Sequence, residues 1–387
     1  MVGSSIGDGT KMDLVTIAYD AATGEEIWAR RYDGPAHGID QGAAVAIDET
    51  NDAVVVTGGS ERVRASGIFD VITIAYDAAS GAPRYERRFS KRPSSSEVGG
   101  DVAAANGMAV VLVNGTVHGH LLAYDAEGDV MWQRWATRRN VSSLVDVEAD
   151  ADRVYVVGST FITFPGSAEY FTAAYLSGDG SLEWRRRYDG PAHFSAGATD
   201  GSLSTDSTRL YVTGTANDFS KAPIATIAYD AATGARDWLR TIPPRPGGSE
   251  LSPRVEVSAD GTRVVVASTS FLDGVNTFLT TSYTASGAVG WTSREDGPDD
   301  VGWLTGLAVA PDGSAYLTGS GKNVGDVTGS ITVAYGPTGG SSAWEAFIPG
   351  VKIGDGVSTV AVAPDVSRVF VACRLSNDIR TDAYLAT

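Results

Sequence analysis

Apolar and polar positions alternate along short runs of this chain, and turn residues separate the runs. The clearest run ends in tyrosine and reads TIAYDAATG, TIAYDAASG, LLAYDAEG and again TIAYDAATG at successive places. Alternation with a period of two is typical of half-buried β-strands. The pattern therefore predicts a protein built from many short strands.

The tyrosine run recurs eight times at nearly constant spacing. Successive intervals are 57, 48, 51, 54, 54, 52 and 49 residues. The tyrosines are Tyr19, Tyr76, Tyr124, Tyr175, Tyr229, Tyr283, Tyr335 and Tyr384. A period of this length indicates repeated β-units rather than unrelated domains. We expect residues 1–387 to form a single repeat domain with about 52 residues per repeat.

Each repeat carries signals for four strands. In one copy, strands are expected near residues 253–258 and 263–268, joined by an Asp-Gly turn, followed by strands that carry Tyr283 and Trp291. An aromatic residue eight or nine positions after each repeat tyrosine is expected to pack between neighbouring sheets. These aromatics are Trp28, Tyr85, Trp132, Trp184, Trp238, Trp291 and Trp344. Glycine usually ends the second strand, at Gly58, Gly115, Gly158, Gly214 and Gly319.

Units of the form Asp…Tyr-Asp…Gly…Trp…Gly…Asp…Ala-Val-Ala…Asp-Gly…Tyr-Val-Thr-Gly resemble the seven-bladed β-propeller repeats common in bacterial secreted and surface proteins. They are more distantly similar to quinoprotein-like propeller repeats. The resemblance covers essentially the whole chain and implies an all-β propeller of four-stranded antiparallel blades in an extracellular or cell-surface setting. It transfers no catalytic residue. Since Cys373 is the single cysteine, the vicinal pair expected of a quinoprotein dehydrogenase is absent, and we expect no quinone cofactor.

The strand signals at the two ends of the chain predict seven blades. The chain starts with a third and a fourth strand, continues through six complete units, and ends with a first, second and third strand. Strands from both termini would then complete one composite blade and remove exposed sheet edges. One third strand is surplus on this interpretation, at residues 13–20 or 381–387, and an eight-bladed parent is the alternative.

Charge and hydropathy restrict the kinds of partner that the protein is expected to bind. A net charge of −17 argues against nucleic acid and against anionic membrane surfaces. The sequence has no apolar run of about 18 residues, which excludes a spanning helix. The start MVGSS lacks the apolar centre of a signal peptide and is similar to VVGST at residues 156–160, so we interpret Met1 as a boundary inside a repeat, with any export signal removed. We expect a monomer.

Repeated loops supply the candidate catalytic residues. The loops RYDGPAHGIDQG and RYDGPAHFSAG place His37 and His193 at equivalent positions, and the related loop REDGPDDVGW contains Asp300. Histidine can move protons near neutral pH. Alternatively, a duplicated loop kept its residues, with Asp33 and Asp189 ordering the turn. A separate pair, His118 and His120, would point to one face of a strand and could begin a metal site, although no third ligand is evident.

Acidic residues recur near the start of the first strand of a repeat. They are Asp40, Glu97, Glu250, Asp300 and Asp355. Carboxylates gathered at a channel mouth would suit calcium, which is the one cofactor that the sequence suggests. The alternative is that each carboxylate accepts hydrogen bonds from the next loop.

Aromatic and basic loop residues outside the repeat are the candidate ligand-binding set, because exposed aromatics often mark recognition sites and arginine binds carboxylates. The set comprises Phe161, Phe164, Tyr170, Phe194, Phe271, Trp303, Arg62 and Arg64.

The sequence leaves three kinds of function open. The first is a secreted or surface binding module that recognises a glycan, small molecule or protein through loops on one face. The second is an enzyme of the lyase, hydrolase or natural-product cyclase type, with a pocket that combines His193, Asp300 and Trp303. The third is a structural repeat domain without a dedicated ligand.

Overall fold

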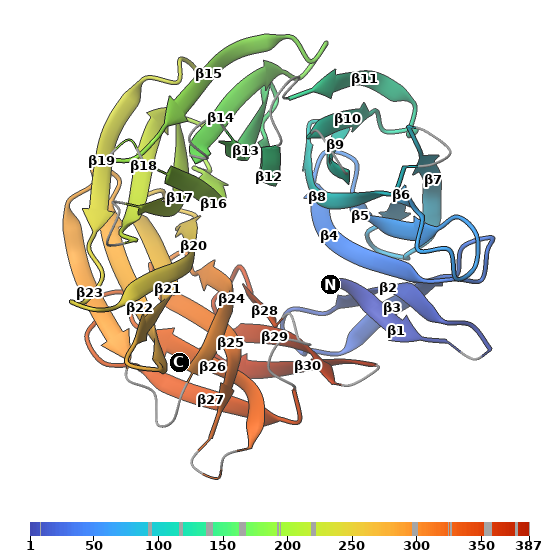
Figure 1. Cartoon of the computed structure of the whole chain (residues 1–387). Helices are drawn as coiled ribbons and strands as arrows, with labels where there is room; N and C mark the ends of the chain where they lie inside the picture. The colour runs from blue at the N-terminus through green and yellow to red at the C-terminus, as the bar shows by residue number, and fades with distance from the viewer. Residues whose placement is uncertain are drawn as a thin grey trace. The chain divides into compact units, whose positions relative to one another are not determined.

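The computed structural model describes residues 1–387 apart from 8, 92–94, 116–118, 137–141, 162–167, 192, 194, 218–221, 296–300, 324, 326, 352–357, 376–377 and 387. The described elements are thirty β-strands in eight antiparallel sheets (Figure 1). Within each sheet the strands are ordered as in the sequence. In the part of the chain that the structure describes, no helix has the length and apolar character needed to cross a membrane.

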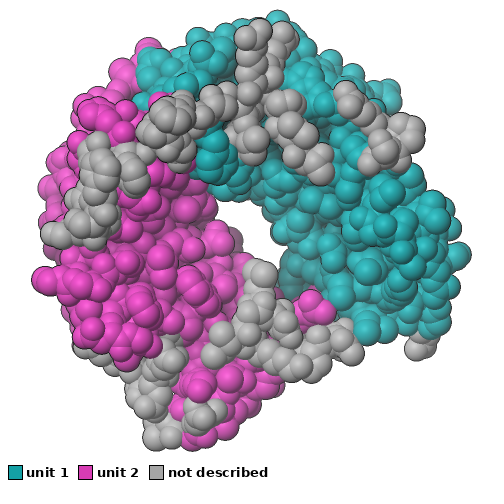
Figure 2. Space-filling view, in the orientation of Figure 1, with its two compact units in different colours: residues 1–166, 170–187 teal, residues 167–169, 188–387 magenta. Residues whose placement is uncertain are grey.

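The chain divides into two compact units, shown in teal and magenta in Figure 2. The first unit comprises residues 1–166 and 170–187. Its four sheets are β1–β3, β4–β7, β8–β11 and β12–β15. The strands are β1 (Val2–Ile6), β2 (Met12–Tyr19), β3 (Glu26–Tyr32), β4 (Asp40–Asp48), β5 (Ala53–Glu61), β6 (Phe69–Asp77), β7 (Pro83–Phe89), β8 (Glu97–Ala105), β9 (Met108–Gly115), β10 (His120–Tyr124), β11 (Val130–Trp135), β12 (Ser142–Ala149), β13 (Arg153–Phe161), β14 (Ala168–Leu176) and β15 (Leu182–Tyr188).

The second unit comprises residues 167–169 and 188–387. Its four sheets are β16–β19, β20–β23, β24–β27 and β28–β30. The strands are β16 (Ser195–Leu203), β17 (Arg209–Asn217), β18 (Ile224–Asp230), β19 (Arg236–Ile242), β20 (Ser249–Val257), β21 (Arg263–Leu272), β22 (Val275–Thr284), β23 (Val289–Glu295), β24 (Val301–Val309), β25 (Ala315–Lys322), β26 (Thr328–Tyr335), β27 (Trp344–Pro349), β28 (Thr359–Val362), β29 (Arg368–Leu375) and β30 (Asp378–Leu385).

The described residues form eight blades, and the prediction of seven is wrong. Strands β1–β3 form one three-stranded sheet and β28–β30 form another, so the termini do not share the composite blade that seven blades required. For the same reason, neither of the two third strands at the ends of the chain is surplus. Both β2 and β30 pair within their own sheets, β2 with β1 and β3, and β30 with β29.

A bulge orients the repeat aromatic on the fourth strand. Ala18 pairs with Trp28 and Tyr19 pairs with Glu26, so Ile27 has no residue opposite it and is 54% exposed. The same register shift occurs between the third and fourth strands of four other sheets. The extra residue re-aims the strand and leaves Trp28 buried.

A second bulge explains several glycines that were predicted to end the second strands, although Gly58, Gly158 and Gly319 each lie inside the strand. The first strand of one sheet bulges between Gly42 and Ala44, which brings the Gln41 carbonyl oxygen close to Gly58. A Cβ atom at Gly58 would lie 1.8 Å from that oxygen. Only glycine leaves room for this approach of two backbones. The same close contact with first-strand backbone occurs at Gly158 and Gly319.

The core lies between neighbouring sheets of a unit, and the repeat aromatics pack there as predicted. The Trp28 ring lies 5.8 Å from the Tyr76 ring of the next sheet, and Trp28 Nε1 donates to the Ala78 carbonyl at 2.8 Å. Arg30 Nε donates to the Gly81 carbonyl at 2.7 Å. We call this pair of donors the blade staple. It recurs at Trp132 with Arg134 and at Trp238 with Arg240.

Candidate functional site

Three carboxylates of the first unit lie together where β1–β3 meets β4–β7. Asp13 is near the start of β2, Asp33 follows β3, and Asp40 is the first residue of β4. One carboxylate oxygen of each lies within 4.8 Å of the other two. Among the residues that the structure describes, this is the one group of three or more acidic, histidine or cysteine side chains with such spacing. We call it the Asp13 cluster.

Asp13 is 1% exposed and has one satisfied oxygen. Its Oδ2 accepts hydrogen bonds from Thr10 Oγ1 at 2.9 Å and from Arg31 Nη1 at 3.2 Å. Arg31 Nη1 also donates to the Ser5 carbonyl at 3.0 Å, which fixes the guanidinium on the Oδ2 side. The other oxygen, Asp13 Oδ1, is buried and has no hydrogen-bond partner.

In Asp33 and Asp40, as in Asp13, one carboxylate oxygen is hydrogen-bonded with normal geometry and the other is not. His37 Nδ1 lies 2.6 Å from Asp33 Oδ2, and the Gly34 NH donates to Asp40 Oδ2 at 2.8 Å. In both residues Oδ1 is buried and accepts no hydrogen bond of normal geometry. Asp13 and Asp33 therefore each have one oxygen bound by the protein and one oxygen without a partner, whereas the Ser60 hydroxyl also interacts with the Asp40 carboxylate.

The local sequence permits this crowding because glycine follows Asp33. A Cβ atom at Gly34 would lie 2.4 Å from Ser60 Oγ and 2.7 Å from Asp40 Oδ1. His37 has a φ of 46°, a left-handed conformation that side chains rarely adopt, and its NH donates to the Gly34 carbonyl. The loop thus turns tightly enough to place Asp33 beside β4.

The electrostatics follow from burial and like charge. Burial raises the pKa of Asp40 above its usual value, and the carboxylates of Asp33 and Asp13 raise it further. The Ser60 hydroxyl and the Gly34 NH offset part of this effect. A buried carboxyl group beside two others favours either a proton or a cation.

A polar network borders the cluster within β4–β7. Arg88 donates to Ser60 Oγ at 2.9 Å, to Asp70 Oδ2 at 3.2 Å and to the Tyr32 hydroxyl at 3.1 Å. Burial would raise the pKa of Asp70, but its ion pairs with Arg62 and Arg88 lower it overall. Both arginines thus pair with Asp70.

The other acidic residues predicted at this strand position lie in separate environments. Glu97 accepts the Lys91 NH at 2.7 Å, and Glu250 pairs with Arg294 at 3.0 Å. Both are buried, and the partners of Glu250 lie within its own blade rather than in the next loop. Asp300 and Asp355 lie outside the described residues.

The histidines of the duplicated loops are placed alike. His37 pairs with Asp33 and His193 pairs with Asp189, both at 2.6 Å, and both histidine side chains are largely exposed. Each aspartate is hydrogen-bonded to the histidine four residues later in the turn. This agrees with the alternative of a duplicated loop in which Asp33 and Asp189 order the turn. Only the first loop adds a carboxylate to a cluster in the described residues.

His120 lies in the core, whereas His118 is outside the described residues. His120 is 5% exposed and stacks on Trp135 at 4.6 Å, and the Lys91 ammonium lies 3.4 Å from the centre of the Trp135 ring. Burial lowers the pKa of His120 to about 4, with a further contribution from Lys91. The side chain is therefore neutral at physiological pH.

The predicted aromatic ligand set divides by exposure. Phe161, Phe271 and Trp303 are 45%, 40% and 46% exposed. Tyr170, which we expected on a loop, is instead fully buried within β14. Phe164 and Phe194 lie outside the described residues.

The two predicted arginines also differ. Arg62 Nε donates to Asp70 Oδ1 at 2.8 Å, and Arg62 Nη2 bonds to Ser90. Arg64 is exposed on the loop between β5 and β6. Arg62 is therefore part of the internal network, and Arg64 remains available to solvent.

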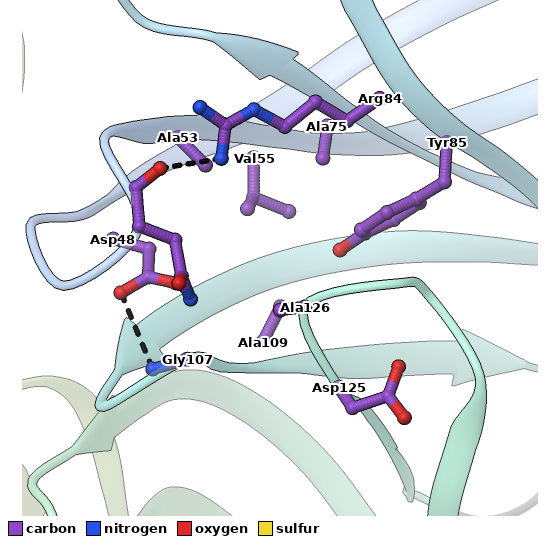
Figure 3. Close-up of a pocket in the computed structure, with 11 residues that line it drawn as sticks. Asp48, Ala53, Val55, Ala75, Arg84, Tyr85, Gly107, Ala109, Asp125 and Ala126 are labelled. Carbon is purple, nitrogen blue, oxygen red and sulfur yellow. Dashed lines mark hydrogen bonds between the residues drawn. The ribbon is translucent and has the colours of Figure 1, made fainter.

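A small pocket lies between β5–β7 and the neighbouring sheet at the position where tyrosine replaces the repeat tryptophan. Figure 3 shows Tyr85 and Asp125 beside it, and Asp48 at its edge accepts the Gly107 NH at 3.3 Å. The carbonyl that a tryptophan would reach belongs to Ala126, by analogy with Trp28 and Ala78. The pocket lies where tyrosine stands in place of the larger tryptophan, and its lining includes the polar side chains of Asp48, Asn51, Arg84 and Asp125.

One further titratable group was not found from the sequence. Burial and the carboxylate of Asp200 raise the pKa of Glu256 to about 8. Ser202 Oγ donates to Glu256 Oε2 at 3.3 Å. The pattern of the repeat gave no signal for it, because its environment depends on a neighbouring strand.

The repeated four-stranded sheets and their staples define a β-propeller protein. Residues 69–310, more than half of the chain, match the family described as outer membrane protein assembly factor BamB, and the chain belongs to this family. The comparison with curated proteins found no match.

Solved structures similar to this chain share its fold at low sequence identity. The Sqt1 protein of Chaetomium thermophilum has a TM-score of 0.61 and 12% identity, with 99% of this chain and 91% of that chain covered. The dihydro-heme d1 dehydrogenase NirN, in complex with DHE, has a TM-score of 0.57 and 14% identity, with coverage of 100% and 70%. Hydrazine synthase of Kuenenia stuttgartiensis has a TM-score of 0.54 and 13% identity, with coverage of 89% and 96%. At this identity the likeness concerns the fold alone.

Proposed function

We propose that this chain is a binding module that recognises a protein through exposed aromatic side chains at the ends of its strands. The observation that carries the proposal is the exposure of Phe271 and Trp303 on adjacent sheets of the second unit. The Leu304 NH donates to Thr269 Oγ1 at 2.8 Å, which holds β24 against β21 near both aromatics. Exposed aromatic side chains on rigid strands are frequent anchors of protein interfaces.

Two further points support a binding role over catalysis. The family description names an assembly factor, which is a role in protein interaction. The pocket beside Tyr85 is smaller than the roughly 300–1,000 Å³ that is typical of ligand-binding and active-site pockets. The same family description and the acidic surface favour a location outside the cytoplasm, and the large negative charge disfavours nucleic acid as the partner.

The proposal can be tested with a random peptide library displayed on phage and selected against the immobilised full chain. Selected peptides are then measured by fluorescence polarisation. Trp303→Ala should weaken binding by roughly 30-fold, since a central aromatic anchor contributes about 2 kcal/mol. Val289→Ala is the matched control, because Val289 is 60% exposed in β23 and apolar but lies outside the aromatic pair.

The unfolding midpoint of each variant is measured alongside. Loss of peptide binding in Trp303→Ala with an unchanged midpoint supports the proposal. Equal binding by Trp303→Ala and the unsubstituted chain would overturn it. Selection of no peptide, together with binding in a parallel glycan array, would reassign the surface to glycans.

A further inference from the structure

The Asp13 cluster has the composition of a site for a hard cation. Its three candidate ligands are carboxylates, and Ca²⁺ prefers six to eight oxygen ligands at 2.3–2.6 Å. Two ligands of one such ion can be at most about 5 Å apart. One oxygen from each of Asp13, Asp33 and Asp40 lies within 4.8 Å of the others, which satisfies this limit.

Burial supplies a second and independent observation. Asp13 and Asp40 are each 1% exposed, yet Oδ1 of each has no hydrogen-bond partner, and Asp33 Oδ1 is in the same condition. Buried polar atoms are almost always paired, and a buried unpaired charge is strongly unfavourable. A cation bound by one oxygen of each residue would offset the charge of all three carboxylates, whereas a shared proton would join at most two of them.

The charge count favours a divalent ion. Three carboxylates and the Arg31 guanidinium carry a formal charge of −2 when His37 is neutral. Arg31 is held on the Oδ2 side of Asp13 by the Ser5 carbonyl, so it does not occupy the space of the orphan oxygens. A divalent cation would neutralise the remaining charge and relieve the repulsion among the carboxylates.

We propose that Asp13, Asp33 and Asp40 bind one Ca²⁺ ion. The ion would link β2 of the first sheet, the loop after β3 and the start of β4, since each of these elements contributes one ligand. It is therefore a structural link between two adjacent blades of the first unit. Extracellular calcium modules bind in the range of about 10⁻⁴–10⁻³ M, and a three-carboxylate site fits that class.

The chain contains its own matched control. Asp189 occupies the equivalent loop position, pairs with His193 at the same 2.6 Å distance as Asp33 does with His37, and belongs to no such group in the described residues. Asp33→Asn and Asp189→Asn thus remove the same charge beside a histidine in the same loop sequence. Only Asp33→Asn removes a ligand of the proposed site.

The experiment uses the full chain stripped with EDTA and titrated with CaCl₂ by isothermal calorimetry at constant ionic strength. Thermal unfolding with Ca²⁺ or EDTA is the second readout. The unsubstituted chain and Asp189→Asn should bind one Ca²⁺ and unfold at a higher temperature with Ca²⁺ than with EDTA. Asp33→Asn should bind at least tenfold more weakly and lose this difference, while its unfolding temperature in EDTA should not fall, because removal of one carboxylate relieves repulsion.

Three results would overturn the proposal. The first is the absence of Ca²⁺ binding to the unsubstituted chain, which would leave a shared proton as the explanation of the cluster. The second is an equal loss of affinity in both variants, which would indicate diffuse attraction to an acidic surface. The third is unchanged affinity in Asp33→Asn. Asp13→Asn provides an additional test, and if it fails to fold the comparison of Asp33→Asn with Asp189→Asn is still decisive.

Discussion

Two blades of this protein place the same kinds of residue at three of four equivalent positions but use them differently. In β4–β7 the positions are occupied by Asp40, Ser60, Asp70 and Arg88, and in β20–β23 by Glu250, Ser270, Thr277 and Arg294. The register confirms the equivalence, since Asp40 pairs with Ser60 and Glu250 pairs with Ser270. We call this set of positions the polar frame.

In the second unit the carboxylate of the polar frame is paired entirely within its own blade. Glu250 is fully buried, and its carboxylate accepts hydrogen bonds from Ser268, Ser270 and Arg294 at 3.0 Å each. All four residues belong to one blade. The charge is therefore neutralised internally, as expected of a buried carboxylate in a stable protein.

In the first unit the arginine of the same frame pairs with Asp70 rather than with Asp40. Asp40 is one methylene shorter than Glu250, and the equivalent Arg88 donates instead to Asp70 and Tyr32. The Asp40 carboxylate consequently lies with Asp13 and Asp33. The two blades thus differ by one methylene, in Asp40 against Glu250, and by one acidic residue on the third strand, Asp70 against Thr277. With these differences Glu250 forms an ion pair with arginine, whereas Asp40 becomes a candidate metal ligand.

The largest effect that would sharpen this comparison is expected from removal of the frame arginine. Arg294→Met should lower the free energy of unfolding by about 3–5 kcal/mol, because it leaves Glu250 as a buried charge without a counter-ion. Arg88→Met should cost about 1–2 kcal/mol, because Asp70 keeps its bond to Arg62. Urea denaturation of both variants measures the difference, and equal costs would show that the two frames are not energetically distinct.

A third copy of the frame position extends the comparison to pH. Here Glu97 accepts the Lys91 NH, and the nearby His120 occupies the core position that Ile72 and Leu279 occupy in the other two blades. The pKa of His120 is lowered to about 4 from 6.5, so the folded state resists protonation more than the unfolded state. Its contribution to stability is complete above about pH 6.5 and declines as the pH falls towards 4.

By pH 5 this decline should amount to about 2 kcal/mol relative to pH 7.5, at 1.36 kcal/mol per pKa unit. His120→Leu should remove that part of the pH dependence and leave the contribution of the carboxylates. Urea midpoints of both proteins across this range test the assignment. Parallel curves for the two proteins would show that His120 does not titrate differently on unfolding.

The smallest effect concerns the aromatic position. Tyr85→Trp should fill the pocket beside Ala126 and complete the missing staple, raising the free energy of unfolding by about 0.5–1 kcal/mol. The reverse change, Trp28→Tyr, should remove the bond to Ala78 and open a similar pocket at a cost of at least that size. Thermal denaturation measures both, and destabilisation by Tyr85→Trp would mean that the pocket is too small for the indole.

The sequence predicted the parts of the fold that repeat. A fixed spacing predicts the strand that carries Tyr76, the contact made by Trp28 and glycines such as Gly58. It does so because every blade packs against its neighbour with residues at equivalent positions. Blade number did not follow, since spacing describes a unit and its neighbour but not which strands the termini join. The end strands β2 and β30 looked interchangeable in sequence, although each pairs in its own sheet.

The candidate site could be predicted only in part from the sequence, for a related reason. The repeat placed Asp40 at the start of a strand and suggested a carboxylate group with its equivalents, such as Glu97 and Glu250. Its actual neighbours are Asp13 and Asp33, which come from a strand and a loop of the preceding sheet. Comparing one repeat with another shows what blades share, whereas this cluster arises from positions where one blade departs from the rest.

The blade staple has a consequence for the history of the chain. Its donors are side chains such as Trp28 and Arg30, but its acceptors are backbone carbonyls, such as those of Ala78 and Gly81. Every residue offers such an acceptor, so the hydrogen bonds of the staple require no particular side chain from the blade that follows. The requirement on that blade is one of shape, because Tyr76 packs on the Trp28 ring and Gly81 leaves room for it. A duplicated gene segment that keeps the repeat tyrosine and glycine could therefore form the same junction with its neighbour.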